Sequence, residues 1–256
     1  MELTVLEYSA AMIGSFIAGA INTLAGNGSV ITLSILTDLI GLPGNIANGT
    51  NRVGVLLQAA GSSSGFAKNN VTDLSKSKLI IALTISGAII GVYCATIVSN
   101  EQFMFVFKYL MIIMLLVIMV KPERWLQTSD VKALPFWVSI PVFLALGFYG
   151  GFIQMGMGIF FLAVLVLISR YSIMEANAIK TIIILIYTVI VLAIFAYKGL
   201  VNWEAGIIMA IGQTLGGYLT AAYASQRSDI HIWAYRLLIA IIIFAICTQF
   251  GLIKLF

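Results

Sequence analysis

Long apolar runs are the feature that most limits what this chain can fold into. An α-helix rises 1.5 Å per residue, so about 20 residues cross a hydrocarbon layer of about 30 Å. Only 9% of the residues are charged, against roughly 25% in a soluble domain. Lipid must therefore surround most of the chain. The sequence predicts eight full spans, at about 3–25, 46–67, 79–98, 103–120, 136–155, 175–197, 205–223 and 232–251.

Two further apolar runs, at 29–42 and 159–169, are too short to cross in the same way. Each follows a glycine turn, GNG at 26–28 and GMG at 156–158, and we interpret each run as a half-helix. Fourteen residues of helix span about 21 Å, so the turns are expected to lie well below the membrane surface. Irregular backbone at that depth is tolerated where it packs in protein or lines a wet cavity. The two turns are therefore expected to frame a cavity near the midplane.

The same signals recur in the same order along the chain, which indicates an internal duplication. The repeated signals are the glycine turns, a polar helix start (ANGTNR at 47–52, ANAIKT at 176–181), and the spacing GxxxGxY at 87–93 and 212–218. The predicted repeats are 1–128 and 129–256, both parts of one transmembrane domain.

The basic residues indicate how the repeats are oriented. If both half-helices cross the membrane, ten Lys and Arg residues fall on one side and four on the other. If both are re-entrant, the split is eight against six. The positive-inside rule favours the first arrangement. It gives an odd number of crossings per repeat, so the predicted fold is all-α and polytopic, with two inverted repeats, each of four full spans and one half-helix. The ten residues predicted to lie inside are Lys68, Lys76, Lys78, Lys121, Arg124, Lys132, Arg170, Lys180, Arg227 and Arg236.

The half-helices predict an anion site, because a helix N-terminus offers free N–H groups and a partial positive charge. Nearby amides can donate to an oxyanion, and an intramembrane cation is a functional candidate. The simpler alternatives are close helix packing for the glycines, interhelical hydrogen bonds for the amides, and snorkelling to the interface for the two cations. The predicted site residues are Asn22, Gly26, Asn27, Gly28, Thr50, Asn51, Arg52, Gln154, Gly156, Met157, Gly158, Asn177 and Lys180.

Little in the sequence indicates an enzyme. It holds one histidine, His231, and no HExxH, CxxC, GxSxG or P-loop pattern. We expect no catalytic residues, metal or cofactor. The net charge of +4 comes from residues clustered in loops, so it indicates membrane topology and not nucleic-acid binding. The expected partners are a small anion and the lipid bilayer, and a homodimer is left open.

The glycine turns and their flanks resemble the sulfite exporter TauE/SafE family. The resemblance rests on GAINTLAGNGS at 19–29, IGLP at 40–43, IANGTN at 46–51, GFYGGFIQMGMG at 147–158, ANA at 176–178 and YKGLVNW at 197–203. It implies a multi-pass permease of the cytoplasmic membrane for sulfite, sulfonates or related anions, often acting as an exporter. The chain departs from the family pattern because Asn27, Ser29, Met157 and Ile159 interrupt the glycine runs, and no proline follows at 32–36 or 161–165. These bulkier residues leave the substrate open.

The hypothesis from the sequence is a secondary transporter that binds a small anion between the two glycine turns. The alternatives are a carrier of a thiol or a carboxylate in the same scaffold, an anion channel, and a membrane scaffold without transport. A carrier should saturate and show counterflow, whereas a channel should show neither. Buried polar residues at the deep turns argue against a pure scaffold.

Overall fold

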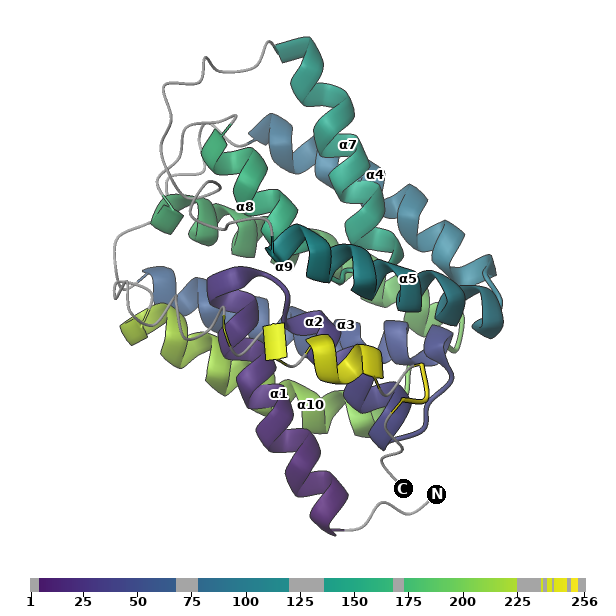
Figure 1. The fold of residues 1–256 in the computed structure, drawn as a ribbon. Helices are drawn as coiled ribbons and strands as arrows, with labels where there is room; N and C mark the ends of the chain where they lie inside the picture. Colours follow the sequence, from purple (N-terminus) through teal and green to yellow (C-terminus); the bar gives the residue numbers. More distant parts are fainter. Residues whose placement is uncertain are drawn as a thin grey trace.

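The computed structural model describes residues 5–67, 78–119, 136–167 and 173–224, together with part of 236–252. Within these ranges all of the regular secondary structure is helical (Figure 1). The helices are α1 (Val5–Ala25), α2 (Gly28–Ser34), α3 (Gly44–Ala67), α4 (Lys78–Ile97), α5 (Asn100–Met119), α7 (Phe136–Phe152), α8 (Met157–Leu167), α9 (Ile173–Tyr197) and α10 (Trp203–Leu219), with π-helical turns η1 (Ile35–Leu39) and η3 (Thr220–Ala224).

Four of the described helices are long and apolar enough to cross a membrane: Glu7–Ala25, Lys78–Ile97, Glu175–Tyr197 and Trp203–Tyr223. Large apolar side chains such as Ile97, Phe105 and Trp137 lie exposed on the outer surface, as expected for residues that face lipid. The chain is therefore an integral membrane protein. Part of the run predicted at 232–251 lies outside the described residues, and so do His231 and the predicted inside charges Lys68, Lys76, Lys121, Arg124, Lys132, Arg170 and Arg227.

Both short helices begin at their glycine turns, slightly earlier than the apolar runs predict. The first begins at Gly28 and continues as η1 to Leu39, and the second begins at Met157. The helix α3 is 24 residues long, but it carries Asn48, Asn51, Arg52 and Gln58 in buried positions. This polar content explains why α3 does not qualify as a span on hydropathy, although its length of about 36 Å suffices.

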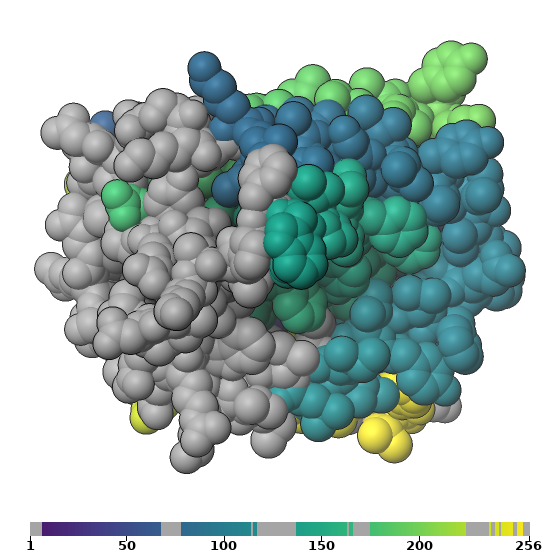
Figure 2. All heavy atoms as spheres, turned by 90° about the horizontal axis from the view of Figure 1, so that it is seen from above, coloured from purple at the N-terminus to yellow at the C-terminus, as the bar shows by residue number. Residues whose placement is uncertain are grey.

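The packing divides the helices into two bundles, and each bundle holds one helix from the other predicted repeat. The first bundle holds α1, α2 and α3 with α10, and the second holds α7, α8 and α9 with α4. The first bundle lies below the second in Figure 1, and α3 packs against α9 where they meet. On the face seen in Figure 2, α7 lies between α4 and α5. Because α4 and α10 carry the matching GxxxG spacings, the exchange places the two copies of this motif in equivalent positions.

The GxxxG glycines make the contacts of this exchange. A Cβ at Gly91 on α4 would lie 2.0 Å from the carbonyl oxygen of Phe148 on α7, and a Cβ at Gly216 on α10 would lie 2.0 Å from that of Phe16 on α1. Such close backbone approach is the usual role of small residues in membrane helices. The packing interpretation of these glycines is therefore the one that the geometry supports.

The order of these contacts gives the helix directions. Along α10, Gly212 meets residues 12–16 of α1 and Gly216 meets residues 16–20, so α1 and α10 run in the same direction. By the same comparison α4 runs parallel to α7, and α3 runs parallel to α10. The helices α3 and α9 run in opposite directions, because Arg52 lies over Phe195 whereas Phe66 clusters with Ala178.

We expect Gly216→Ala to lower the thermal unfolding midpoint of the purified protein. Alanine gains about 1 kcal/mol in helix propensity, but its Cβ would be forced against the backbone of α1, and overpacking costs about 1–3 kcal/mol. The matched control is Gly14→Ala on α1, whose Cβ would meet only the terminal Cδ1 of Ile35, an atom that can move aside. Equal midpoints for the two variants would contradict the proposed close packing of α1 and α10.

Candidate functional site

The two glycine turns lie against each other at the junction of the bundles. The Gly158 N–H donates to the Gly26 carbonyl oxygen at 3.0 Å. A Cβ at Gly26 would lie 2.3 Å from the Gly158 carbonyl carbon, and Gly26 has a φ of +75°, so glycine is required there for both space and conformation. The sequence predicts a cavity framed by the turns, whereas the structure brings their backbones into direct contact.

Arg52 of α3 lies beside this crossing and is fully buried. Its Nη1 donates to the carbonyl oxygen of Gly150 at 2.7 Å and to Oε1 of Gln154 at 2.9 Å. Its Nη2 donates to Oδ1 of Asn48 and to the carbonyl oxygen of Gly151, both at 3.1 Å. The guanidinium carbon also lies 5.7 Å from the centroid of the Phe195 ring, within the range of a cation–π contact. Arg52 therefore does not snorkel to an interface.

Lys180 of α9 holds the corresponding place on the other side of the crossing, with 1% of its surface exposed. Its Nζ donates to Oδ1 of Asn177 at 2.7 Å and to the carbonyl oxygens of Asn22 and Thr23 at 3.3 and 3.4 Å. Those carbonyls end α1 just before the first glycine turn, as Gly150 and Gly151 end α7 before the second. A helix C-terminus carries partial negative charge. Each cation therefore has a favourable electrostatic partner in the helix end, but no ionised acidic side chain in the described part of the chain.

The two cation sites are reciprocal between the two predicted repeats. Arg52 and Lys180 are 128 positions apart, and so are their respective acceptors, Asn22 from Gly150 and Thr23 from Gly151. Within the described residues, every hydrogen-bond acceptor of either cation is a neutral oxygen. A charge taken out of water normally needs an opposite charge nearby. The junction therefore holds two buried basic side chains with no acidic partner among the described residues.

Three unpaired hydrogen-bond donors lie in buried positions on the same elements. The side chain of Asn27 is fully buried, and neither its amide nitrogen nor its oxygen has a partner. Nδ2 of Asn51 and Nε of Arg52 are also unpaired, although Asn51 Oδ1 accepts from Thr32 at 2.6 Å. An unpaired buried donor costs about 1–3 kcal/mol, so three of them on adjoining elements indicate a place for an acceptor.

Gln154 in the second turn has an unusual backbone. It has a φ of +67°, the only positive φ at a non-glycine residue in the described part of the chain. Its Oε1 accepts from both Arg52 Nη1 and the Tyr187 hydroxyl. Strained backbone of this kind persists where surrounding contacts hold it, and it tends to occur at functional sites.

The structure brings the other predicted residues to the same junction, with differing roles. Asn22 donates to Gln58 at 2.7 Å, the interhelical role considered as its alternative, and Thr50 accepts from the Asn202 N–H at 2.9 Å. Asn177 holds Lys180. The remaining glycines Gly28 and Gly156 and the buried Met157 form the turns themselves.

Several polar residues at the junction were missed by the sequence reasoning. They are Thr23, Asn48, Gln58, Ser62 and Tyr187, all buried. Gln58 connects Asn22 with Thr23 and Ser62, and Asn48 donates to the Phe152 carbonyl oxygen at 2.7 Å. Polar side chains within a predicted membrane span were the available signal, and α3 carries most of them.

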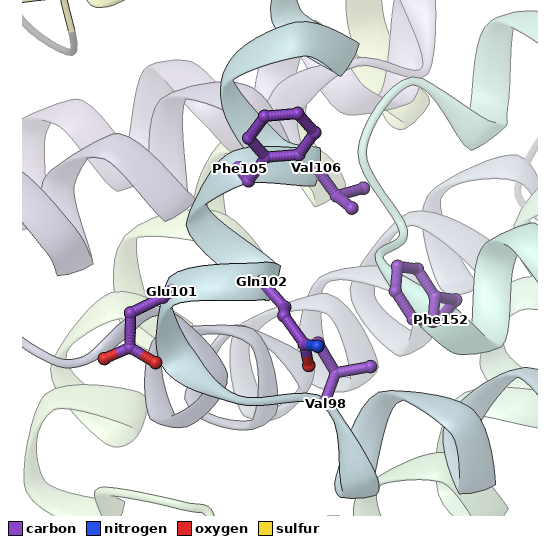
Figure 3. A pocket seen from close by; sticks show the side chains of 6 residues that line it. All are labelled: Val98, Glu101, Gln102, Phe105, Val106 and Phe152. Atoms are coloured by element: carbon purple, nitrogen blue, oxygen red, sulfur yellow. The ribbon is translucent and has the colours of Figure 1, made fainter.

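Two hollows open elsewhere on the described surface. The larger, about 550 Å³, is lined by Val98, Glu101, Gln102, Phe105, Val106 and Phe152 (Figure 3). The smaller, about 210 Å³, lies among Tyr8, Ile40, Gly41, Leu42, Asn202, Glu204 and Ala205. Neither is lined by a predicted site residue, but each includes a residue that is hydrogen-bonded to the junction: Phe152 in the larger hollow accepts from Asn48, and Asn202 in the smaller donates to Thr50. The described residues also contain no group of three His, Cys, Asp or Glu side chains able to hold a metal.

Comparison with known proteins places the chain among membrane transporters. The family described as sulfite exporter TauE/SafE matches residues 11–250. The "probable membrane transporter protein ORF9" of Sinorhizobium sp is 26% identical, over 84% of this chain and 82% of that protein. The "probable membrane transporter protein YfcA" of Escherichia coli is 28% identical, over 79% and 75%. A "probable membrane transporter protein" of Haemophilus influenzae is 24% identical, over 80% of each. No solved structure matches the chain significantly.

Proposed function

The chain belongs to the sulfite exporter TauE/SafE family, and we propose that it is a secondary transporter of a small, sulfur-containing anion in the cytoplasmic membrane. The anion binds at the junction of the two bundles, beside the crossing of the glycine turns. Sulfite and short sulfonates are the proposed substrates, in keeping with the family description. Relatives named as probable membrane transporters support the general activity.

The observation that carries the anion assignment is the pair of buried basic side chains at the junction. Arg52 and Lys180 are buried, and their acceptors are neutral oxygens. The unpaired donors of Asn27, Asn51 and Arg52 lie on the same elements. An oxyanion would supply both the missing charge and the missing acceptors, whereas a neutral thiol would supply neither. In this proposal Asn27, Asn51 and Arg52 donate hydrogen bonds to the anion, and Lys180 attracts it.

Inverted repeats are part of the proposal, and the helix directions support them. Because α1 and α3 both run parallel to α10, the segment from α2 to residue 43 must return toward the side where α1 begins. That return is what a crossing half-helix requires. Alternating access then arises when the two bundles rock against each other around the fixed site. The moving bodies are the exchanged bundles and not residues 1–128 and 129–256.

We expect Asn27→Ala to weaken anion binding without destabilising the unliganded protein. Its side-chain amide makes no hydrogen bond to the described protein residues, not even as the N-cap of α2, so alanine removes an unpaired group and gains about 1 kcal/mol or more. The affinity for sulfite should fall roughly tenfold, which is the change expected when one charge-assisted hydrogen bond is lost. The measurement is the sulfite-dependent rise in unfolding midpoint, together with uptake into proteoliposomes.

The matched control for this prediction is Asn45→Ala, since Asn45 only accepts from the N–H of Ile46 at the start of α3. Unchanged sulfite binding by Asn27→Ala would remove Asn27 from the site. If acetate or a thiol raised the unfolding midpoint and no sulfur oxyanion did, the substrate would belong to a different chemical class from the one proposed. Saturable uptake with counterflow would support a carrier, and conduction without saturation would indicate a channel.

A further inference from the structure

The side-chain oxygen of Gln154 accepts hydrogen bonds from both Arg52 and Tyr187. We propose that Gln154 is an internal counter-ligand of Arg52, positioned by Tyr187, which the transported anion must displace. This inference rests on the proposed function and adds a regulatory step to the same site.

The chemistry of the contact favours displacement. Gln154 Oε1 lies 2.9 Å from Arg52 Nη1, where the oxygen of a bound anion would form a charge-assisted hydrogen bond. Hydrogen bonds between two charged groups are shorter and stronger than those to a neutral amide. An oxyanion therefore displaces Gln154. A neutral solute of similar size forms a weaker hydrogen bond with Arg52 and does not displace it. The counter-ligand thus contributes to selectivity for anions.

Tyr187 fixes the counter-ligand in place. Its hydroxyl is fully buried and donates to the same oxygen of Gln154. With Tyr187 on one side and Arg52 on the other, the amide oxygen has little freedom to turn away. Tyr187 is a positioning residue in this scheme, since it acts on Arg52 only through Gln154.

The strained backbone of Gln154 links displacement to the turn crossing. A left-handed conformation at a non-glycine residue is strained, and the two side-chain hydrogen bonds of Gln154 help to hold it. When the anion replaces Gln154 as the hydrogen-bond acceptor of Arg52, the second glycine turn loses the restraint that this hydrogen bond supplied. Four residues later, the Gly158 N–H makes the hydrogen bond to Gly26 that joins the two turns. Substrate binding therefore loosens the contact that must open for the bundles to rock.

The alternative role for Gln154 is a direct substrate ligand through its amide N–H groups. The two roles predict opposite effects for Gln154→Ala. Loss of a ligand weakens anion binding, whereas loss of a counter-ligand strengthens it. Alanine and glutamine carry the same backbone penalty at a positive φ, so the comparison isolates the side chain.

The experiment is calorimetric titration of purified wild-type and variant protein with sulfite, with methanesulfonate and acetate as further probes. Gln154→Ala should lower the dissociation constant for sulfite by roughly fivefold to tenfold, as expected when one competing hydrogen bond is removed. Tyr187→Phe should also lower the dissociation constant for sulfite, but by a smaller factor. Gln154→Glu places a fixed carboxylate on Arg52 and should raise the constant by at least about tenfold. In proteoliposomes, the KM for sulfite should fall with Gln154→Ala.

Matched variants separate this effect from general loosening of the turn. Gln213→Ala truncates a buried glutamine on α10, and Tyr149→Phe removes a hydroxyl that donates to the Met155 carbonyl oxygen in the same turn. Neither should strengthen sulfite binding. If Gln154→Ala does not fold, Gln154→Met keeps the length of the side chain without the amide oxygen. Unchanged or weaker sulfite binding by folded Gln154→Ala or Gln154→Met, with normal wild-type binding, would overturn the counter-ligand and leave the proposed function standing. No binding of any of the three anions to the wild type would overturn both.

Discussion

Arg52→Gln should reduce sulfite uptake at least about 100-fold while leaving a folded protein. Glutamine can still donate to a carbonyl oxygen at the end of α7, but it removes the charge that the anion needs. Each hydrogen bond between a charged donor and its acceptor contributes about 1.5–3 kcal/mol, so the loss of two of them exceeds about 3 kcal/mol, or roughly a factor of 100. The measurement is the initial rate of uptake of sulfite into proteoliposomes, with the unfolding midpoint as a check on the fold.

Arg52→Lys provides the comparison that isolates charge from geometry. Lysine keeps the positive charge but presents a single ammonium where arginine spreads two nitrogens over Gly150, Gly151, Asn48 and Gln154. We expect uptake to survive with a KM raised roughly tenfold, the cost of one such hydrogen bond. If Arg52→Gln transported sulfite with a wild-type KM, the arginine would be a structural tie between the bundles and not part of the anion site.

The short helices could be predicted from the sequence because their signals are local. A 14-residue apolar run behind a glycine turn can be recognised in the amino-acid sequence. The helices α2 and α8 begin within two residues of the predicted starts. Part of the polar junction was also predictable, because polar side chains in an apolar chain are few, but Thr23, Asn48, Gln58, Ser62 and Tyr187 were not singled out. The family resemblance suggested from the turns agrees with the match over residues 11–250.

Most partners of the two cations could not be predicted, because they lie far away in the sequence; the exceptions are Asn48 and Asn177, which lie about one helical turn from Arg52 and Lys180. Arg52 binds residues 98 to 102 positions away, and Lys180 binds residues 157 and 158 positions away. A helix position about 12 Å from the start of α3 suits a snorkelling arginine as well as a buried one. Only the packing of α3 and α9 across the bundle junction decides between them. The exchange of α4 and α10 is likewise a long-range arrangement, although the GxxxG spacing marked both helices as closely packed.

The direct contact of the glycine turns leads to a further expected result. Gly26→Ala should destabilise the protein by about 3 kcal/mol and reduce sulfite uptake to near background. The left-handed φ of Gly26 costs an alanine about 1–2 kcal/mol, and overpacking against the Gly158 backbone, 2.3 Å from the new Cβ, adds about 1–3 kcal/mol. The turns can relieve the contact only by separating, which breaks the Gly158–Gly26 hydrogen bond and shifts the neighbouring donors of Asn27.

Gly199→Ala is the matched control for this result, because it carries the conformational penalty without the contact. Gly199 has a φ of +68°, and nothing lies within 4 Å of a Cβ placed there. Its variant should lose only about 1–2 kcal/mol and transport sulfite normally. The difference between the two variants in unfolding midpoint and in uptake therefore measures the turn crossing alone. Equal effects would mean that the crossing tolerates a side chain, and the bundles would then need another element to close the site.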